Sequence, residues 1–145
     1  MNKPARPTRA DYKVFYPITT RWSDNDIYGH VNNVMYYSYF DTAANRYLIE
    51  EGGLDIGDGS IVGYVVSSGC EYHAPITYPE AIDAGLRVDR LGNSSVQYGI
   101  AIFRDGEQEA VAHGHFVHVF VERAQNRSVP IPQALRTALQ RLLQE

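Results

Sequence analysis

Apolar and aromatic residues recur along the chain in two rhythms, one typical of strands and one typical of helices. A run rich in β-branched and aromatic residues, 12–22, predicts a strand, and Pro17 favours an edge position or a bulge there. Turn residues separate the later strand-like runs, so we expect these runs to form an antiparallel meander of four strands. They cover residues 61–73, 81–91, 94–104 and 108–121.

A long helical pattern lies between the first strand and the others. It covers residues 34–51, with Asn32 or Asn33 as N-cap and a pair of glycines after it as the stop. Its apolar residues spread nearly all round the helix, which indicates burial on several sides. A short amphipathic helix is expected after a proline start, over residues 132–144.

The order of these elements predicts an α+β fold. An antiparallel sheet of about five strands wraps around one long central helix, and a short C-terminal helix ends the chain. Such a sheet covers only part of the helix, and a second copy is the simplest way to bury the rest, so we expect a homodimer. Residues 1–145 are expected to form a single domain, with residues 1–11 as a loose N-terminal arm.

Composition excludes several classes of partner. The formal net charge is −4, and no basic stripe interleaves with aromatic residues, so a nucleic-acid partner is not expected. No apolar run has the length of a membrane span, and the N-terminus lacks the apolar core of a secretion signal. The single cysteine, Cys70, excludes an internal disulfide and suits a cytoplasmic location.

Most of the candidate chemistry lies just before the long helix. Residues 21–33 read RWSDNDIYGHVNN, with two carboxylates, a glycine, a histidine and two asparagines. This order would place a carboxylate beside the positive end of a helix, where backbone N–H groups have no partner within the helix. A general base next to such oxyanion donors is what hydrolysis of an acyl group requires, so the segment predicts an enzyme.

This segment, continuing into YYSYF at 36–40, resembles the hotdog-fold acyl-CoA thioesterases, in particular the branch that contains 4-hydroxybenzoyl-CoA thioesterase. Weaker matches follow in the same order at 72–76, 91–95, 119–123 and 129–132. The resemblance implies hydrolysis of an acyl-CoA thioester to the free acid and coenzyme A. It implies no metal and no cofactor beyond the coenzyme A of the substrate. It also implies a homodimer, with a homotetramer built as a dimer of dimers left open.

The resemblance places the catalytic carboxylate on Asp26, which would either activate a water molecule or attack the thioester carbonyl directly. An aspartate that bonds its own loop in an Asx turn is the alternative role. The resemblance points to the backbone amide of Asn33 as oxyanion donor, with Val31 and Asn32 beside it at the substrate.

Three other residues of the segment have expected roles. Gly29 is expected either to adopt a positive φ or to let the ligand approach closely. His30 is a neighbour of the site, as a second acid–base group or as a loop histidine bonded to backbone. Asp24 is expected to hold the loop or to pair with the arginine three residues before it.

Substrate-binding residues are less specified. Arg87, Arg90 and Arg104 lie on the meander where relatives hold the phosphates of coenzyme A, and Ser94 is a further candidate for substrate binding. Because LGN at 91–93 replaces the basic run that some members carry before the serine, a partner subunit, or Arg123 and Arg127, are the alternative sources of these contacts. Aromatic residues such as Tyr36, Tyr37 and Phe40 are expected to shape the acyl pocket. The length or aromatic character of the acyl group stays open, as does the choice between coenzyme A and an acyl-carrier protein.

Other functions remain as alternatives. His113 and His115 share one strand face at a spacing that can bind metal, but no third ligand accompanies them in sequence, so an ordinary strand face is favoured. An enoyl-CoA hydratase-like hotdog enzyme is a second enzymatic reading, although the Asn-Pro that those relatives usually carry is missing. A non-catalytic acyl-CoA or acyl-carrier binding protein would show affinity without turnover.

Overall fold

The computed structural model describes residues 5–57 and 59–143. Short 3₁₀ helices lie at Arg9–Asp11 and Trp22–Asp24. The helices and strands follow in the order β1 (Val14–Thr19), α1 (Asn33–Glu50), β2 (Ile61–Tyr72), β3 (Ala81–Leu91), β4 (Ser95–Arg104), β5 (Ala112–Glu122), β6 (Arg127–Ser128) and α2 (Gln133–Gln140).

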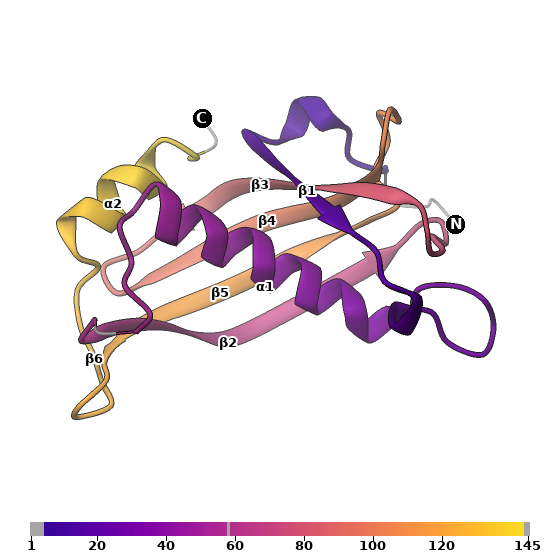
Figure 1. The fold of residues 1–145 in the computed structure, drawn as a ribbon. Coiled ribbons are helices and arrows are strands. Elements are labelled where there is room, and N and C mark those ends of the chain that lie inside the picture. The colour runs from indigo at the N-terminus through magenta and orange to yellow at the C-terminus, as the bar shows by residue number, and fades with distance from the viewer. Residues whose placement is uncertain (1–4, 58, 144–145) are drawn as a thin grey trace.

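The strands form one antiparallel sheet in the order β1-β3-β4-β5-β2, and β6 pairs with β5 (Figure 1). Strands β3, β4 and β5 form a meander as predicted. The prediction that β2 begins this meander is wrong, because β2 pairs with β5, from Ile61 opposite Glu122 to Tyr72 opposite Ala112. The eight-residue connection 73–80 spans roughly 26 Å when extended, which is enough to cross three strand spacings of about 4.8 Å each.

Local capping sets both ends of α1. The side chain of Asn32 accepts a hydrogen bond of 3.0 Å from the Val34 N–H, so Asn32 is the N-cap. At the other end, the N–H groups of Gly52 and Leu54 both donate to the Leu48 carbonyl. Gly53 between them adopts a positive φ of 72°, which confirms the glycine pair as the stop.

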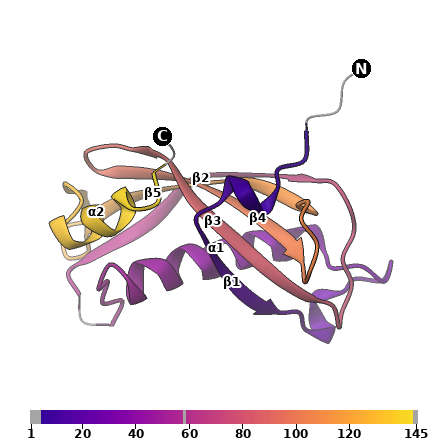
Figure 2. The same cartoon turned by 90° about the horizontal axis from the view of Figure 1, so that it is seen from above.

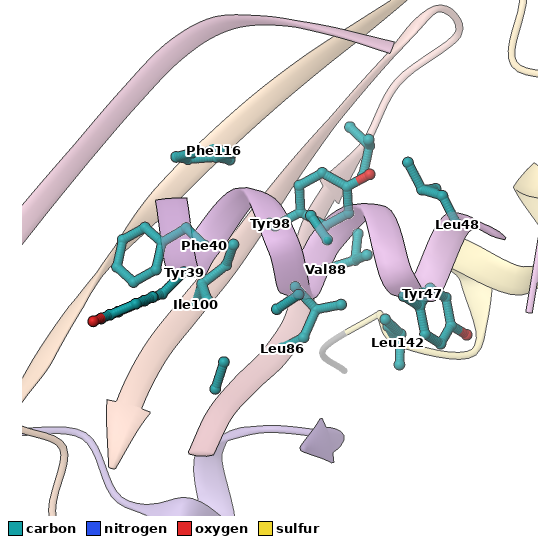
Figure 3. Packing of buried hydrophobic residues seen from close by; sticks show 14 of the residues in the cluster. Tyr39, Phe40, Tyr47, Leu48, Leu86, Val88, Tyr98, Ile100, Phe116 and Leu142 are labelled. Carbon is teal, nitrogen blue, oxygen red and sulfur yellow. The ribbon is translucent and has the colours of Figure 1, made fainter. Parts of the chain in front are cut away.

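Helix α1 lies across one face of the sheet, as Figure 2 shows from above, and the buried core fills the space between them. Side chains at spacings of three and four on α1 meet alternate side chains of β3, β4 and β5 (Figure 3). The exposed Val34 and Ile49 lie on the other side of α1, so within this chain the helix is buried on one side and not on several. The buried residues of α1 are Tyr36, Tyr39, Phe40, Ala43, Ala44, Tyr47 and Leu48.

Helix α2 closes one end of this core. Its Leu135 and Leu139 are buried, and the hydroxyl of Tyr47 donates a hydrogen bond of 2.6 Å to the Ala138 carbonyl. The helix predicted over 132–144 is confirmed in place and is shorter, and residue 144 lies outside the described residues. Within the described part of the chain, neither α1 nor α2 is long and apolar enough to cross a membrane.

The N-terminal segment differs from the loose arm expected over residues 1–11. Residues 1–4 lie outside the described residues, but residues 5–11 are held against the connection between β4 and β5. The Arg6 Nε donates a hydrogen bond of 2.8 Å to the Ala110 carbonyl, and the Arg9 N–H donates to the Gln108 carbonyl. These backbone partners order the segment, which the polar sequence alone did not indicate.

The two edges of the sheet differ. Pro17 lies on the edge strand β1, as predicted, opposite Asp83 of β3. Strand β2 forms the other edge, and among the described residues its outer side has no strand partner. Exposed apolar side chains gather along this strand, at Tyr64, Val65 and Val66.

Candidate active site

Asp24 anchors the base of the loop that precedes α1. Its carboxylate is almost fully buried and accepts hydrogen bonds from the Arg21 Nε at 3.0 Å and from the Tyr39 hydroxyl at 2.7 Å. Burial alone would raise the pKa of Asp24, but the bonds from Tyr39 and Arg21 outweigh it and hold this pKa below its usual value. Both expected roles of Asp24 are therefore confirmed, since it pairs with Arg21 and holds the loop.

Asp26 closes a tight turn with the residues that follow it. Its N–H donates to the His30 carbonyl at 2.9 Å, and its carbonyl accepts from the Gly29 N–H at 3.0 Å. One carboxylate oxygen accepts from the Tyr28 N–H at 2.9 Å, which is the Asx-turn contact considered above. The half-buried side chain borders a concavity of about 510 Å³. Its lining residues are Trp22, Ser23, Asn25, Asp26, Ile27 and Gly29.

Gly29 and His30 complete this turn. Gly29 has a φ of 82°, and a Cβ built on it would meet no atom within 4 Å, so its backbone conformation rather than close packing explains the glycine. His30 is exposed, and its carbonyl is the group that bonds the turn. Within the described residues, no hydrogen bond to the His30 ring is seen.

The backbone amides at the start of α1 are not equivalent. The Val31 N–H donates to the Ile76 carbonyl, and the Asn32 N–H donates to the Asp24 carbonyl, each at 2.8 Å. Asn33 is the first residue of the 18-residue helix α1, and its N–H has no acceptor among the described residues. Hydrogen bonding thus distinguishes Asn33 from the two amides before it.

Asn33 borders a pocket of about 310 Å³ between α1 and the end of β2. The hydroxyl of Tyr72 donates to the Asn33 carbonyl at 3.1 Å, and its ring meets that of Tyr36 edge-on at 5.0 Å. Burial raises the pKa of Tyr36 to about 12, so this phenol is neutral at neutral pH. The pocket is lined by Val31, Asn33, Tyr36, Tyr72, His73, Ala74 and Pro75.

Sequence reasoning missed Tyr72 as a residue of this site. The only signal was its position at the start of the match at 72–76, where it was read as a strand residue. Tyr37, which was expected in the pocket wall, is not among the residues that line this pocket, and it packs edge-on against Phe40 at 6.3 Å.

The predicted site residues do not all meet within the chain. Asp26 and Asn33 belong to the same loop and helix start, yet they border two different concavities. Arg87 bonds Asp89 at 2.8 Å and lies over the ring of Tyr12, so its guanidinium is already engaged. The turn between β3 and β4, with Arg90 and Ser94 beside it, lies next to α2, at the opposite end of the sheet from the loop of Asp26 (Figure 1).

The histidines of β5 make separate contacts. His113 lies 2.8 Å from the ring nitrogen of His73 and 3.2 Å from the carboxylate of Glu71. His115 lies 3.4 Å from the hydroxyl of Ser67. Within the described residues, no group of three or more histidine, cysteine or acidic side chains is placed to hold a metal ion.

The chain is similar in sequence to one protein family and similar in structure to several solved proteins. A family model described as the thioesterase-like superfamily matches residues 20–139. The PA5185 protein of Pseudomonas aeruginosa PAO1 is 62% identical, with 97% of this chain and 99% of that chain covered and a TM-score of 0.96.

Two further solved structures are similar. The PA2801 protein of P. aeruginosa, a candidate thioesterase, is 31% identical over 86% of this chain and 95% of its own, with a TM-score of 0.78. Slr0204 of Synechocystis, a 1,4-dihydroxy-2-naphthoyl-CoA thioesterase, shares the fold at 18% identity and a TM-score of 0.78, with 87% and 94% covered. Comparison with curated protein sequences gives no match.

Proposed function

Because this chain belongs to the thioesterase-like superfamily, we propose that it hydrolyses an acyl-CoA thioester to the free acid and coenzyme A. The observation that carries the proposal is the unbonded Asn33 N–H at the start of α1, beside a pocket and seven residues after Asp26. Coenzyme A is proposed as the thiol because the fold is shared with an enzyme named for an acyl-CoA substrate.

The chemistry follows from charge development on the thioester. Attack on the carbonyl carbon moves negative charge onto the carbonyl oxygen, and the Asn33 N–H with the dipole of α1 behind it would stabilise that charge. In one route, Asp26 takes a proton from water, hydroxide adds to the carbonyl, and the C–S bond breaks to release the thiolate. In the other, the carboxylate of Asp26 adds to the carbonyl carbon, the C–S bond breaks to release the thiolate of coenzyme A, and water then hydrolyses the anhydride between the acyl group and Asp26.

A second protomer is part of the proposal. Asp26 and Asn33 border separate concavities in one protomer, so the chemistry needs a further surface to enclose the substrate between them. The open edge of β2 presents unpaired backbone groups together with the exposed Val65 and Val66, and such an edge is a template for pairing with another strand. We therefore propose a homodimer in which the β2 edges meet.

Substrate contacts are assigned on the same basis. The acyl group would lie in the pocket formed by Tyr36 and Tyr72 beside Asn33, with Val31 in the pocket wall. The guanidinium of Arg87 already bonds Asp89, so it is not assigned to coenzyme A. The turn near Arg90 and Ser94 lies at the opposite end of the sheet from the loop of Asp26, so these two residues would contact coenzyme A bound at the site of another protomer (Figure 1).

Thiol release from a panel of short, long and aromatic acyl-CoAs tests the proposal. The wild type should turn over at least one substrate, and Asp26→Asn should lose that turnover while remaining folded. Asp41→Asn is the matched control, because Asp41 is an exposed aspartate on α1 whose hydrogen bonds among the described residues stay within its own helix turn, to Asn45.

The alternatives predict different outcomes of this assay. An enoyl-CoA hydratase would consume enoyl-CoA without releasing thiol, and an acyl-CoA binding protein would bind the substrates without turning them over. Release from acyl-carrier thioesters but not from acyl-CoA would contradict the coenzyme A part of the proposal. Full activity of Asp26→Asn would contradict the assigned role of Asp26.

A further inference from the structure

The loop of Asp26 is held from a second side, by the connection between β2 and β3. The hydroxyl of Thr77 donates a hydrogen bond of 2.7 Å to the Gly29 carbonyl. A hydroxyl has one proton, and the carbonyl of Tyr78 lies farther away at 3.4 Å, so the bond to Gly29 is the stronger one. The same hydroxyl oxygen accepts from the Asn25 side-chain amide at 3.2 Å.

The connection bonds the loop on both sides of Asp26. Before Asp26, the side-chain oxygen of Asn25 accepts from the Tyr78 N–H at 3.1 Å, so this amide uses both of its ends on the connection. After Asp26, Gly29 bonds Thr77, and the Val31 N–H donates to the Ile76 carbonyl at 2.8 Å. Thr77 lies at the centre of this set, because its hydroxyl contacts the loop on both sides of Asp26.

Thr77 is itself fixed to the sheet. Its N–H donates to one carboxylate oxygen of Glu80 at 2.9 Å, and the Arg104 Nε donates to the other at 2.7 Å. The half-buried Glu80 carboxylate thus links β4 to the connection, and the buried Thr20 hydroxyl bonds the Glu80 carbonyl at 2.7 Å. A chain of charge-assisted hydrogen bonds therefore runs from Arg104 of the rigid sheet to Thr77.

We propose that Thr77 is a positioning residue for Asp26, an inference that rests on the proposed thioesterase function. The turn from Asp26 to His30 is closed by two backbone hydrogen bonds and by the bond from the Tyr28 N–H to the Asp26 carboxylate, so it moves as a unit. Its most flexible point is Gly29, and the Thr77 hydroxyl fixes the peptide that follows that glycine. Because reaction rates depend steeply on the placement of the reacting group, loss of this bond lowers turnover more than substrate binding.

The decisive variants are Thr77→Val, which removes the hydroxyl at nearly constant shape, and Thr77→Ser, which keeps it. Thr42→Val is the matched control, because the Thr42 hydroxyl also bonds a main-chain carbonyl, that of Ser38 at 2.8 Å, but on the exposed side of α1. Two readouts are compared: kcat and KM for acyl-CoA hydrolysis, and hydrogen exchange at the amides of residues 26–31.

For Thr77→Val we expect kcat about five- to tenfold lower with KM changed less than about twofold, as loss of one hydrogen bond would give. Exchange at residues 26–31 should accelerate by a similar factor, Thr77→Ser should restore both values, and Thr42→Val should change neither. Unchanged exchange or unchanged kcat in Thr77→Val overturns the proposal, and so does an equal loss in Thr77→Ser.

The two readouts separate this inference from the proposed function. If the wild type hydrolyses no acyl-CoA, the proposed function fails, and the positioning role for hydrolysis fails with it. Hydrogen exchange still decides whether Thr77 holds the loop. If the wild type is active and Thr77→Val is equally active, only the role of Thr77 is contradicted.

Discussion

The hydroxyl of Tyr39 donates a hydrogen bond of 2.7 Å to the carboxylate of Asp24, and both side chains are buried. This contact joins the second turn of α1 to the base of the loop that carries Asp26. The carboxylate keeps its charge there because Tyr39 and Arg21 together compensate for its burial. The position of the candidate catalytic loop is therefore coupled to the packing of the central helix.

Removal of the Tyr39 hydroxyl should destabilise the fold. Tyr39→Phe leaves the buried carboxylate of Asp24 with one donor fewer, and we expect the free energy of unfolding to fall by about 1–3 kcal/mol. Urea unfolding followed by circular dichroism measures this loss. The exposed Tyr28 provides the control, since Tyr28→Phe should change stability by less than about 0.5 kcal/mol.

The backbone amide of Asn33 can be removed without breaking the helix. Proline is tolerated at the first position of a helix, and the preceding Asn32 is already extended, with φ −62° and ψ 140°. If the amide stabilises the oxyanion, Asn33→Pro should lower kcat by about 10²–10³-fold with little change in Tm. Asn33→Ala keeps the N–H and should cost less than either Asn33→Pro or Asp26→Asn. Near-normal kcat in Asn33→Pro would show that the amide has no such role.

Acid should weaken the fold through His118. Burial lowers the pKa of this histidine to about 4, and its ring lies among Phe116, Phe120 and Tyr98, whose hydroxyl is 3.1 Å from Nδ1. As the pH falls below 6.5, His118 becomes protonated in the unfolded chain but stays neutral in the folded one. The free energy of unfolding should therefore drop by roughly 3 kcal/mol between pH 6.5 and pH 4 and level off below that.

A double variant tests the acid effect of His118. Tyr98→Phe combined with His118→Phe removes both partners of the buried pair, so the decline of stability between pH 6.5 and pH 4 should become shallower by about that amount. If the free energy of unfolding falls with pH equally steeply in the double variant and the wild type, groups other than His118 cause the acid effect. Urea midpoints at a series of pH values supply the measurement.

The open edge of β2 should be the dimer contact. Val66 and Ile56 are each 61% exposed, but Val66 lies on the β2 edge and Ile56 lies in the loop before this strand. Val66→Lys should weaken the dimer by at least about tenfold in Kd, because a charge would be buried against the partner strand. Ile56→Lys should leave the dimer intact. Sedimentation equilibrium distinguishes the two, and a monomeric wild type or a dimeric Val66→Lys would contradict the proposed contact.

Local pattern was enough to predict most elements of this fold. Strand β3 begins and ends at the predicted residues, and α1 differs by one residue at each end, because alternation and capping are encoded within each segment. The partner of β2 was not predictable in this way. Its ladder with β5 joins Tyr72 to Ala112 and Ile61 to Glu122, and nothing within either strand specifies so distant a pairing.

The candidate site shows the same division. Asp24, Asp26, Gly29 and Asn33 follow one another in a single motif, so their proximity could be predicted from the sequence. Thr77 belongs to the site only because residues 73–80, which connect β2 to β3, pass beside the loop of Asp26. The family resemblance points to the Asn33 amide, but the residues alone do not indicate which amide at the helix start is unbonded, since that depends on acceptors that other segments supply.

The pairing of β2 with β5 also sets how long β2 stays unpaired during synthesis on the ribosome. Synthesis of the 50 residues from Tyr72 to Glu122 takes roughly 3–10 s at typical elongation rates. During this interval the nascent β2 lacks its strand neighbour β5, while its valines and the apolar face of α1 are emerging from the exit tunnel. The nascent chain therefore passes through a stage that is prone to aggregation. Slower translation between β2 and β5 would lengthen the time during which chaperones have to protect it.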